Sequence, residues 1–253
     1  MKKKLLVATG IVLLVIGTIL GGIGLRKHLS EKNAGEIYEE LKVQMDIEPL
    51  IKLPQVETEQ VENPIDFDSL TKEYPDIYAW IRIPGTKVDY PIVQREGDNS
   101  YYLNHTIDGK KKTEGSIFTE DYNGKDFEDA NTIIYGHNMK NGSMFKTLHK
   151  YKDKQFLLDN SEIFIYQKGR VLKYKIFAAY VYDNRHLMLS FDFEDENIFK
   201  IYLNNVLTKR DMSSNINTNV DVTAKDKIIT LSTCNNNDAQ RYLVQAVLLS
   251  IQE

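Results

Sequence analysis

The C-terminal part of the chain is a series of short apolar runs separated by turn residues. From Tyr78 onward, the runs are rich in β-branched and aromatic residues, a composition typical of strands. Dipeptides that favour tight turns, such as Pro84-Gly85 and Asn123-Gly124, lie between them. We expect eight strands, at Tyr78–Ile83, Asp89–Gln94, Gly115–Thr119, Thr132–His137, Glu162–Gln167, Leu172–Tyr182, Lys227–Cys234 and Arg241–Ile251. Eight short strands separated by such turn residues predict a mainly β fold closed into a barrel.

Apolar residues at helical spacing predict helices before and between these strands. Ser30 to Met45 has apolar residues at every fourth position in Ile37, Leu41 and Met45. A short helix is expected near Phe67 to Tyr74, with Asp66 or Asp68 near its start. A short helix is expected at Met144–Tyr151. The clearest later helix is Phe191–Lys209, where four large apolar residues form one stripe: Phe199, Tyr202, Leu203 and Val206.

The N-terminus carries an uncharged run from Leu5 to Leu25. As a helix this run spans about 31 Å, which matches the hydrocarbon core of a bilayer. A cleaved signal peptide is the alternative, but its apolar region is usually shorter and ends at a small-residue cleavage site. The basic residues Lys2, Lys3 and Lys4 favour a retained anchor with a cytoplasmic N-terminus and an extracellular C-terminal domain.

These patterns divide the chain into four parts. Residues 1–4 form a cytoplasmic tail and residues 5–25 a transmembrane anchor. Residues 26–65 form a stalk and linker, because the stretch from Pro54 to Pro64 is acidic and poor in large apolar residues. Residues 66–253 form one globular domain, for which the 42 % hydrophobic content supplies a sizeable core.

Charge and cysteine content exclude several classes of protein. The formal net charge of −4 argues against nucleic acid as a main partner. A single cysteine cannot build a disulfide framework or a zinc ribbon. The acidic residues are scattered, so no metal and no cofactor is expected. Structural cysteines outside the membrane normally pair, so a free thiol there favours a chemical role.

That cysteine, Cys234, ends one of two apolar runs joined by a short polar loop, and Arg241 begins the other. The two runs predict a hairpin in which both side chains lie on one face. A nearby guanidinium favours a thiolate and can bind an oxyanion. A lone cysteine is more often a small buried hydrophobe. However, Thr230 and Ser232 share its alternating face, which is more typical of a polar cleft floor than of a core.

His137 is the strongest candidate partner among the five histidines. It ends the expected strand Thr132–His137 after a glycine, and residues at strand ends are common catalytic positions. Because side chains alternate along a strand, the neighbouring Asn138 is not expected to complete a triad.

Three separate motifs resemble those of sortases, the membrane-anchored cysteine transpeptidases of Gram-positive bacteria. Thr230-Leu-Ser-Thr-Cys234 with the following Arg241 resembles the active-site strand, and Tyr135-Gly-His-Asn138 resembles the histidine motif. The stretch from Asp76 to Gln94, followed by Tyr101-Tyr-Leu-Asn104, is similar to class B sortases. The resemblance implies an eight-stranded barrel with N-terminal helices and a long helix before the cysteine strand.

The resemblance also implies a reaction. Cys234 would cleave a C-terminal sorting signal of secreted proteins after its threonine, and the resulting acyl group would pass to an amine of the peptidoglycan precursor. His137 would act as acid and base, and Arg241 would hold the substrate or its oxyanion. Signals like Asn-Pro-x-Thr-Asn are expected for class B. Candidate substrate-binding residues are Asn104, Asn184, Met188, Leu189, Ser232 and Thr233.

Two other functions use the same residues. A hydrolytic cysteine peptidase would pass the acyl group to water. A barrel displayed on the membrane for binding alone would keep Cys234 as a structural residue.

Overall fold

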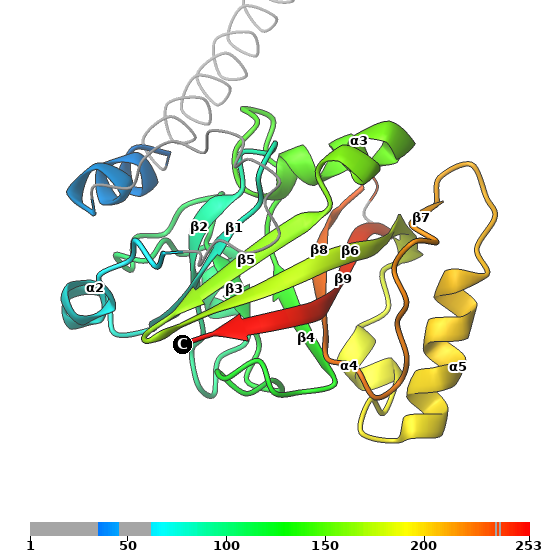
Figure 1. The fold of residues 1–253 in the computed structure, drawn as a ribbon. Coiled ribbons are helices and arrows are strands. Elements are labelled where there is room, and N and C mark those ends of the chain that lie inside the picture. Colours follow the sequence, from blue (N-terminus) through cyan, green and yellow to red (C-terminus); the bar gives the residue numbers. More distant parts are fainter. Residues whose placement is uncertain (1–34, 46–61, 236, 238) are drawn as a thin grey trace, which may run out of the picture.

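Within the residues that the computed structural model describes, 35–45, 62–235, 237 and 239–253, the main feature is a closed β-barrel (Figure 1). Its strands follow one another in the order β5-β1-β2-β3-β4-β8-β9-β6, and a β5–β6 pairing closes the ring. The bounds are β1 Ile77–Arg82, β2 Asp89–Val93, β3 Ile117–Thr119, β4 Asn131–Tyr135, β5 Glu162–Gln167, β6 Arg170–Asp183, β8 Ile228–Cys234 and β9 Gln240–Gln252. These eight strands confirm the predicted barrel.

Strand β7, Asn215–Ile216, was not predicted. It pairs with β6 on the outside of the ring. Two residues are too short a run to show any alternation of apolar and polar positions, so the sequence carries no strand signal there.

Two parallel pairings join strands that are distant in sequence. Strand β2 pairs with β3, and β4 pairs with β8, whereas the other neighbours in the ring are antiparallel. The β4–β8 register sets Tyr135 beside Ser232. The ends of these two strands therefore lie side by side.

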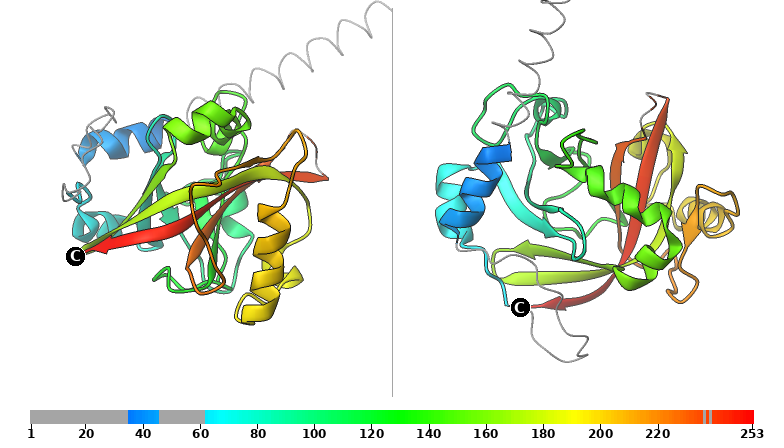
Figure 2. Two further views of the ribbon diagram at one scale, coloured as in Figure 1. Left: turned by 45° about the vertical axis from the view of Figure 1, so that its right-hand side comes forward. Right: turned by 90° about the horizontal axis from the view of Figure 1, so that it is seen from above.

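Helices cover the outside of the barrel. Residues 35–44 are helical, which confirms this part of the helix predicted over Ser30–Met45, whereas 30–34 lie outside the described residues. Tyr38 is buried against the barrel. The remaining helices are α2 Phe67–Glu73, the 3₁₀ segments η1 Tyr101–Leu103 and η2 Phe145–Lys152, α3 Lys154–Asp159, α4 Leu187–Ser190 and α5 Glu196–Leu207. Figures 1 and 2 show α5 and the helix of residues 35–44 on opposite sides of the barrel.

The predicted helix Phe191–Lys209 starts too early and ends two residues late. Asp195 caps α5, because its side chain accepts hydrogen bonds from the N–H groups of Asn197 and Ile198. A carboxylate in this position satisfies N–H groups that have no partner within the helix, and so fixes the start of the helix. The stripe of Phe199, Tyr202, Leu203 and Val206 is buried, as predicted.

Strand β8 separates two apolar layers. Ile229 and Leu231 point into the barrel core, whereas Ile228 on the opposite face packs in the layer under α5. Thr230, Ser232 and Cys234 share the α5 face, because side chains alternate along a strand. Thr233 shares the inner face with Leu231.

A buried polar network ties this outer face of the barrel to α5. Gln245 donates to Tyr202 and to Thr230, each at 2.8 Å, and Thr230 donates to Asn131 at 2.8 Å. The Tyr180 hydroxyl lies 3.1 Å from that of Tyr202. Because Thr230 is fully buried in this network, the prediction that it belongs to an open cleft floor is wrong.

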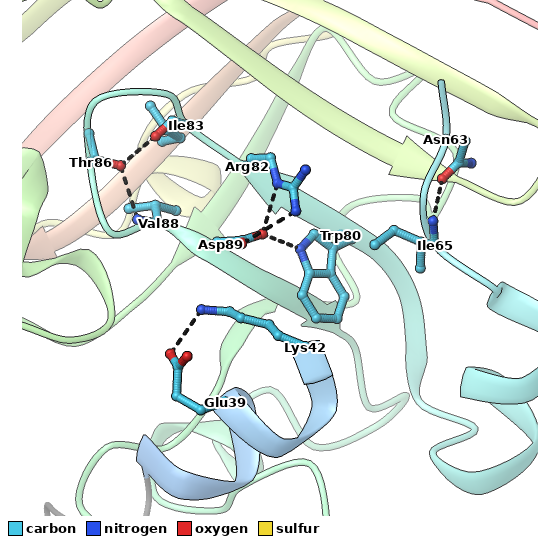
Figure 3. A network of polar contacts seen from close by, with 10 residues as sticks. All are labelled: Glu39, Lys42, Asn63, Ile65, Trp80, Arg82, Ile83, Thr86, Val88 and Asp89. Atoms are coloured by element: carbon cyan, nitrogen blue, oxygen red, sulfur yellow. Dashed lines mark hydrogen bonds and ion pairs between the residues drawn. The ribbon is translucent and has the colours of Figure 1, made fainter. Parts of the chain in front are cut away.

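A second buried polar group stabilises the β1–β2 hairpin (Figure 3). Asp89 accepts hydrogen bonds from Trp80 Nε1 at 2.7 Å and from Arg82 Nε at 3.1 Å. The Arg82 and Asp89 side chains are only 9 % and 12 % exposed. Each charge in this pair therefore depends on the other for compensation.

Part of the predicted N-terminal organisation lies outside the described residues. This holds for the anchor at Leu5–Leu25 and for most of the linker. In the part of the chain that the structure describes, no helix has the length and apolar character needed to cross a bilayer.

Candidate active site

The ends of β4 and β8 bring His137 and Cys234 to neighbouring positions. Tyr135 pairs with Ser232, and the N–H of Gly136 donates to the Ser232 carbonyl at 3.1 Å. Two residues further along, the Asn138 side chain donates to the Cys234 carbonyl at 2.9 Å. The histidine and the cysteine, 97 positions apart in the sequence, therefore lie at the same end of the barrel.

Arg241 joins this group from β9. It is the register partner of Cys234 across the β8–β9 turn, so the two side chains lie on one face. Its positive charge acts on the Tyr135 phenol, opposing the rise in that group's pKa. Burial, followed by the neighbouring Glu120 carboxylate, raises the Tyr135 pKa well above its usual value. Three strands, β4, β8 and β9, thus contribute to one polar surface.

Cys234 forms no disulfide, and the residue as a whole is partly buried. His137 is also partly exposed, and its Nε2 lies 2.7 Å from the Leu103 carbonyl oxygen. Because a carbonyl can only accept, Nε2 carries the hydrogen of this bond. Nδ1 is then the nitrogen that can gain or lose a proton.

Sequence reasoning missed two side chains that contact the nucleophile's backbone. Asn138 Nδ2 and His149 Nε2 both donate to the Cys234 carbonyl, at 2.9 and 3.1 Å. Alternation along a strand gives no guide to the direction of the Asn138 side chain, since β4 ends at Tyr135. His149 lies 85 positions from Cys234, on η2, and no local pattern signals the contact.

Burial lowers the pKa of His149, and the nearby Lys152 and Lys146 charges act in the same direction. Its ring stacks on Tyr242 with centroids 4.9 Å apart. A neutral ring is favoured in this setting, because protonation would place a charge in a half-buried site beside two lysines.

Three of the six predicted substrate-binding residues, Asn104, Asn184 and Ser232, lie on segments next to this end of the barrel. Asn104 is exposed and follows Leu103, which holds His137. Asn184 is exposed just after β6. Met188 and Leu189, on α4, are placed elsewhere. They line a cavity of about 390 Å³ with Tyr122 and Asn131, and because Asn131 is the first residue of β4, this cavity lies toward the opposite end of that strand from His137. Ser232 is 6 % exposed and lies on the Cys234 face.

Thr233 is placed differently. It is 2 % exposed, and its register partner is Tyr242, whose ring belongs to the barrel core. Its side chain therefore faces away from the Cys234 surface.

Two further contacts fix the position of α4. His186 Nε2 lies 2.6 Å from Glu120 Oε2, and its Nδ1 accepts from the Leu189 N–H. The cavity wall formed by Met188 and Leu189 is thereby tied to the end of β3. Among the described residues, no cluster of three or more histidine, cysteine, aspartate or glutamate side chains is arranged to hold a metal ion.

Comparison with known proteins identifies a family whose members are similar to this chain. The model of the sortase domain family matches residues 81–249. Sortase B of Listeria monocytogenes is 40 % identical over 185 residues, which cover 72 % of this chain and 73 % of the relative. Sortase B of Staphylococcus aureus is 31 % identical over 252 residues, 98 % of each chain. A solved S. aureus sortase B–substrate complex superposes with a TM-score of 0.71 at 30 % identity, covering 88 % of this chain and 99 % of that one.

Proposed function

The chain belongs to the sortase family, specifically to the class B sortases, which are cysteine transpeptidases, and we propose that it cleaves an Asn-Pro-x-Thr-Asn-like sorting signal and transfers the acyl group to a cell-wall amine. The strongest support is that β4, β8 and β9 bring an imidazole, a free thiol and a guanidinium to one end of the barrel. Sorting signals and wall precursors are the substrates of the family in general.

In the proposed reaction, Cys234 Sγ attacks the carbonyl carbon of the signal's threonine as a thiolate. The C–N bond after the threonine breaks, and the departing amine takes a proton from His137. This step leaves a thioester on Cys234. The wall amine then attacks the thioester carbonyl, loses a proton to His137, and releases the thiolate as the new amide forms.

Arg241 is proposed to stabilise the negative charges that form during this reaction. A guanidinium beside the thiolate stabilises the charged nucleophile, and its N–H groups can donate to the oxyanion that forms at the carbonyl. The register pairing with Cys234 supports this role, because it sets the cation on the nucleophile's face of the sheet.

Recognition of the signal is proposed for three side chains near Cys234 and for two on α4. Asn104, Asn184 and Ser232 are proposed to hydrogen-bond the peptide. Met188 and Leu189 are proposed to contact its apolar part, and Leu189 is well suited because it is 68 % exposed. A sorting peptide is extended, so it presents both amide groups and side chains along its length.

The proposal also assigns a role to the N-terminal segment, as a membrane anchor. The uncharged run Leu5–Leu25 is proposed to anchor the protein in the cell membrane, with a cytoplasmic N-terminus and an extracellular catalytic domain. Its partners would then be secreted proteins that carry a sorting signal, together with the peptidoglycan precursor.

A peptide-transfer assay tests the proposal. The full chain is incubated with a panel of sorting peptides and candidate wall amines, and the products are identified by mass spectrometry. The wild type is expected to form an amide-linked product that depends on the amine, whereas Cys234→Ala forms neither that product nor the cleaved peptide. Transfer by Cys234→Ala near the wild-type rate would rule out the nucleophile.

The same assay separates the two other functions. A hydrolytic peptidase would yield only the free acid, whatever amine is added. A binding barrel would leave every peptide intact, and Cys234 would then react slowly with alkylating reagents.

A further inference from the structure

The segment η2 contacts the backbone of both proposed catalytic residues. At its start, the Phe145 N–H donates to the His137 carbonyl at 2.9 Å. Near its end, His149 Nε2 donates to the Cys234 carbonyl at 3.1 Å. One short segment therefore connects the end of β4 to the end of β8, in addition to the ladder between these strands.

The Cys234 carbonyl accepts a second hydrogen bond. Asn138 Nδ2 donates to the same oxygen at 2.9 Å. A carbonyl oxygen has two lone pairs, so two donors from different directions occupy both and limit rotation of this peptide unit. Cys234 is the last residue of β8, where the ladder no longer restrains the chain on both sides.

His149 is held in one orientation by its surroundings. Its ring stacks on the Tyr242 ring. The Lys152 ammonium also lies over the Tyr242 ring, 5.3 Å from the ring centroid. Lys152 also donates to the Asn235 side chain at 3.0 Å. Because the Cys234 carbonyl can only accept, Nε2 is the protonated nitrogen. Nδ1 is buried, and it finds no hydrogen-bond partner among the described residues.

We infer that His149 and Asn138 are positioning residues that clamp the Cys234 peptide, so that the thiol is held at His137, an inference that rests on the proposed roles of Cys234 and His137. Neither side chain is required to touch the substrate. The clamp sets the Cα–Cβ direction of Cys234, because the peptide that follows this residue is fixed by two donors. Small displacements of a reacting atom lower the rate of attack strongly, so the clamp acts on kcat.

Two substitutions of His149 separate its hydrogen bond from its packing. His149→Phe keeps a ring on Tyr242 but removes the donor. His149→Gln loses the ring but keeps an amide N–H near the position of Nε2. Lys150→Met is the matched control, because Lys150 on the same segment donates to a different backbone carbonyl, that of Gly85, at 3.1 Å.

The transfer assay described above is run on the full chain with each variant. Loss of one neutral hydrogen bond is expected to lower kcat of His149→Phe roughly fivefold, with KM unchanged. His149→Gln is expected to stay within about twofold of the wild type, and Lys150→Met to match it. The Asn138→Ala and His149→Phe pair is expected to lose more than the product of the single losses, because only the pair leaves the carbonyl without a donor.

Two results would overturn the clamp. Equal losses in His149→Phe and His149→Gln would show that packing, not the hydrogen bond, matters, and wild-type kcat in both would show that neither does. The rate of Cys234 alkylation by iodoacetamide is measured in parallel and is expected to follow the order of kcat. If the wild type transfers no peptide at all, the proposed function fails, and the alkylation rates still decide whether the clamp controls the thiol.

Discussion

Arg241 stands directly across the β8–β9 ladder from Cys234. The pairing is antiparallel and close to the turn, so the two side chains project from the same face of the hairpin. The position of the Arg241 backbone is set by this ladder and not by a loop.

Substitution of Arg241 tests this relationship. Arg241→Ala is expected to lower kcat/KM for a sorting peptide by roughly 10²–10³, the typical effect of removing one oxyanion donor. Arg241→Lys keeps the charge but loses the planar fork, and should fall between the two. Arg210→Ala, whose guanidinium contacts backbone carbonyls at the end of α5, serves as the control. Equal kcat/KM for Arg241→Ala and the wild type would remove Arg241 from the mechanism.

Gly136 is the one residue between Tyr135 and His137, and it has no room for a side chain. A Cβ at this position would lie 2.6 Å from Ile117 Cδ1 and 2.6 Å from Phe145 Cδ2. Gly136→Ala is expected to cost about 1–3 kcal/mol of unfolding free energy by overpacking. It should also lower kcat, because Phe145 holds the His137 carbonyl.

Urea unfolding and the transfer assay measure the two effects of Gly136→Ala. Gly35→Ala is the control, since a Cβ there meets no atom within 4 Å. Shortening the displaced ring in Gly136→Ala/Phe145→Leu should recover part of the lost stability. A double variant less stable than Gly136→Ala would contradict this explanation.

The buried pair Arg82–Asp89 predicts a strong asymmetry between single and double substitutions. Asp89→Leu leaves the Arg82 charge without compensation and is expected to cost about 3–5 kcal/mol. Arg82→Met/Asp89→Leu removes both charges and should regain part of that loss, but not all of it, because Trp80 Nε1 still lacks its acceptor. Urea unfolding curves provide the free energies. Asp68→Ala, which breaks the exposed pair with Lys168, should change stability very little.

His149 predicts a pH dependence of stability. Burial lowers its pKa below the usual 6.5, so the folded protein binds this proton less readily than the unfolded chain. Unfolding free energy should therefore decrease as the pH falls from about 6.5 through the lower folded-state pKa, with no contribution from this group at higher pH. Urea unfolding between about pH 8 and pH 5 should show a smaller decrease for His149→Phe than for the wild type. Parallel curves for the two proteins would contradict the buried neutral ring.

The sequence could predict the pairing of Cys234 with Arg241 because the two residues lie close in the chain. The apolar runs that end at Cys234 and begin at Arg241 predict the pairing directly, and the eight strands follow from the same kind of local pattern. The motifs also identified the family. The start of α5 was predicted wrongly because the Phe191 and Phe193 side chains extend the apolar pattern beyond the Asp195 cap.

Contacts that depend on the closed barrel could not be predicted in this way. The parallel pairing of β4 with β8 determines where Asn138 lies, and nothing near Asn138 in the sequence specifies it. His149 reaches Cys234 only because η2 crosses the end of both strands. Thr230 shows the opposite error: its polar side chain indicated solvent, but Asn131 and Gln245 supply its hydrogen bonds inside the protein.

The network of Thr230, Gln245 and Tyr202 has a consequence for how a substrate is selected. Detaching α5 from the barrel would break several hydrogen bonds in a dry environment and would leave their polar atoms exposed to apolar neighbours. The outer wall beneath the thiol is therefore stiff before any peptide arrives. For the proposed sorting peptide, a stiff wall would favour chains already inclined to be extended, because they lose the least conformational freedom on binding.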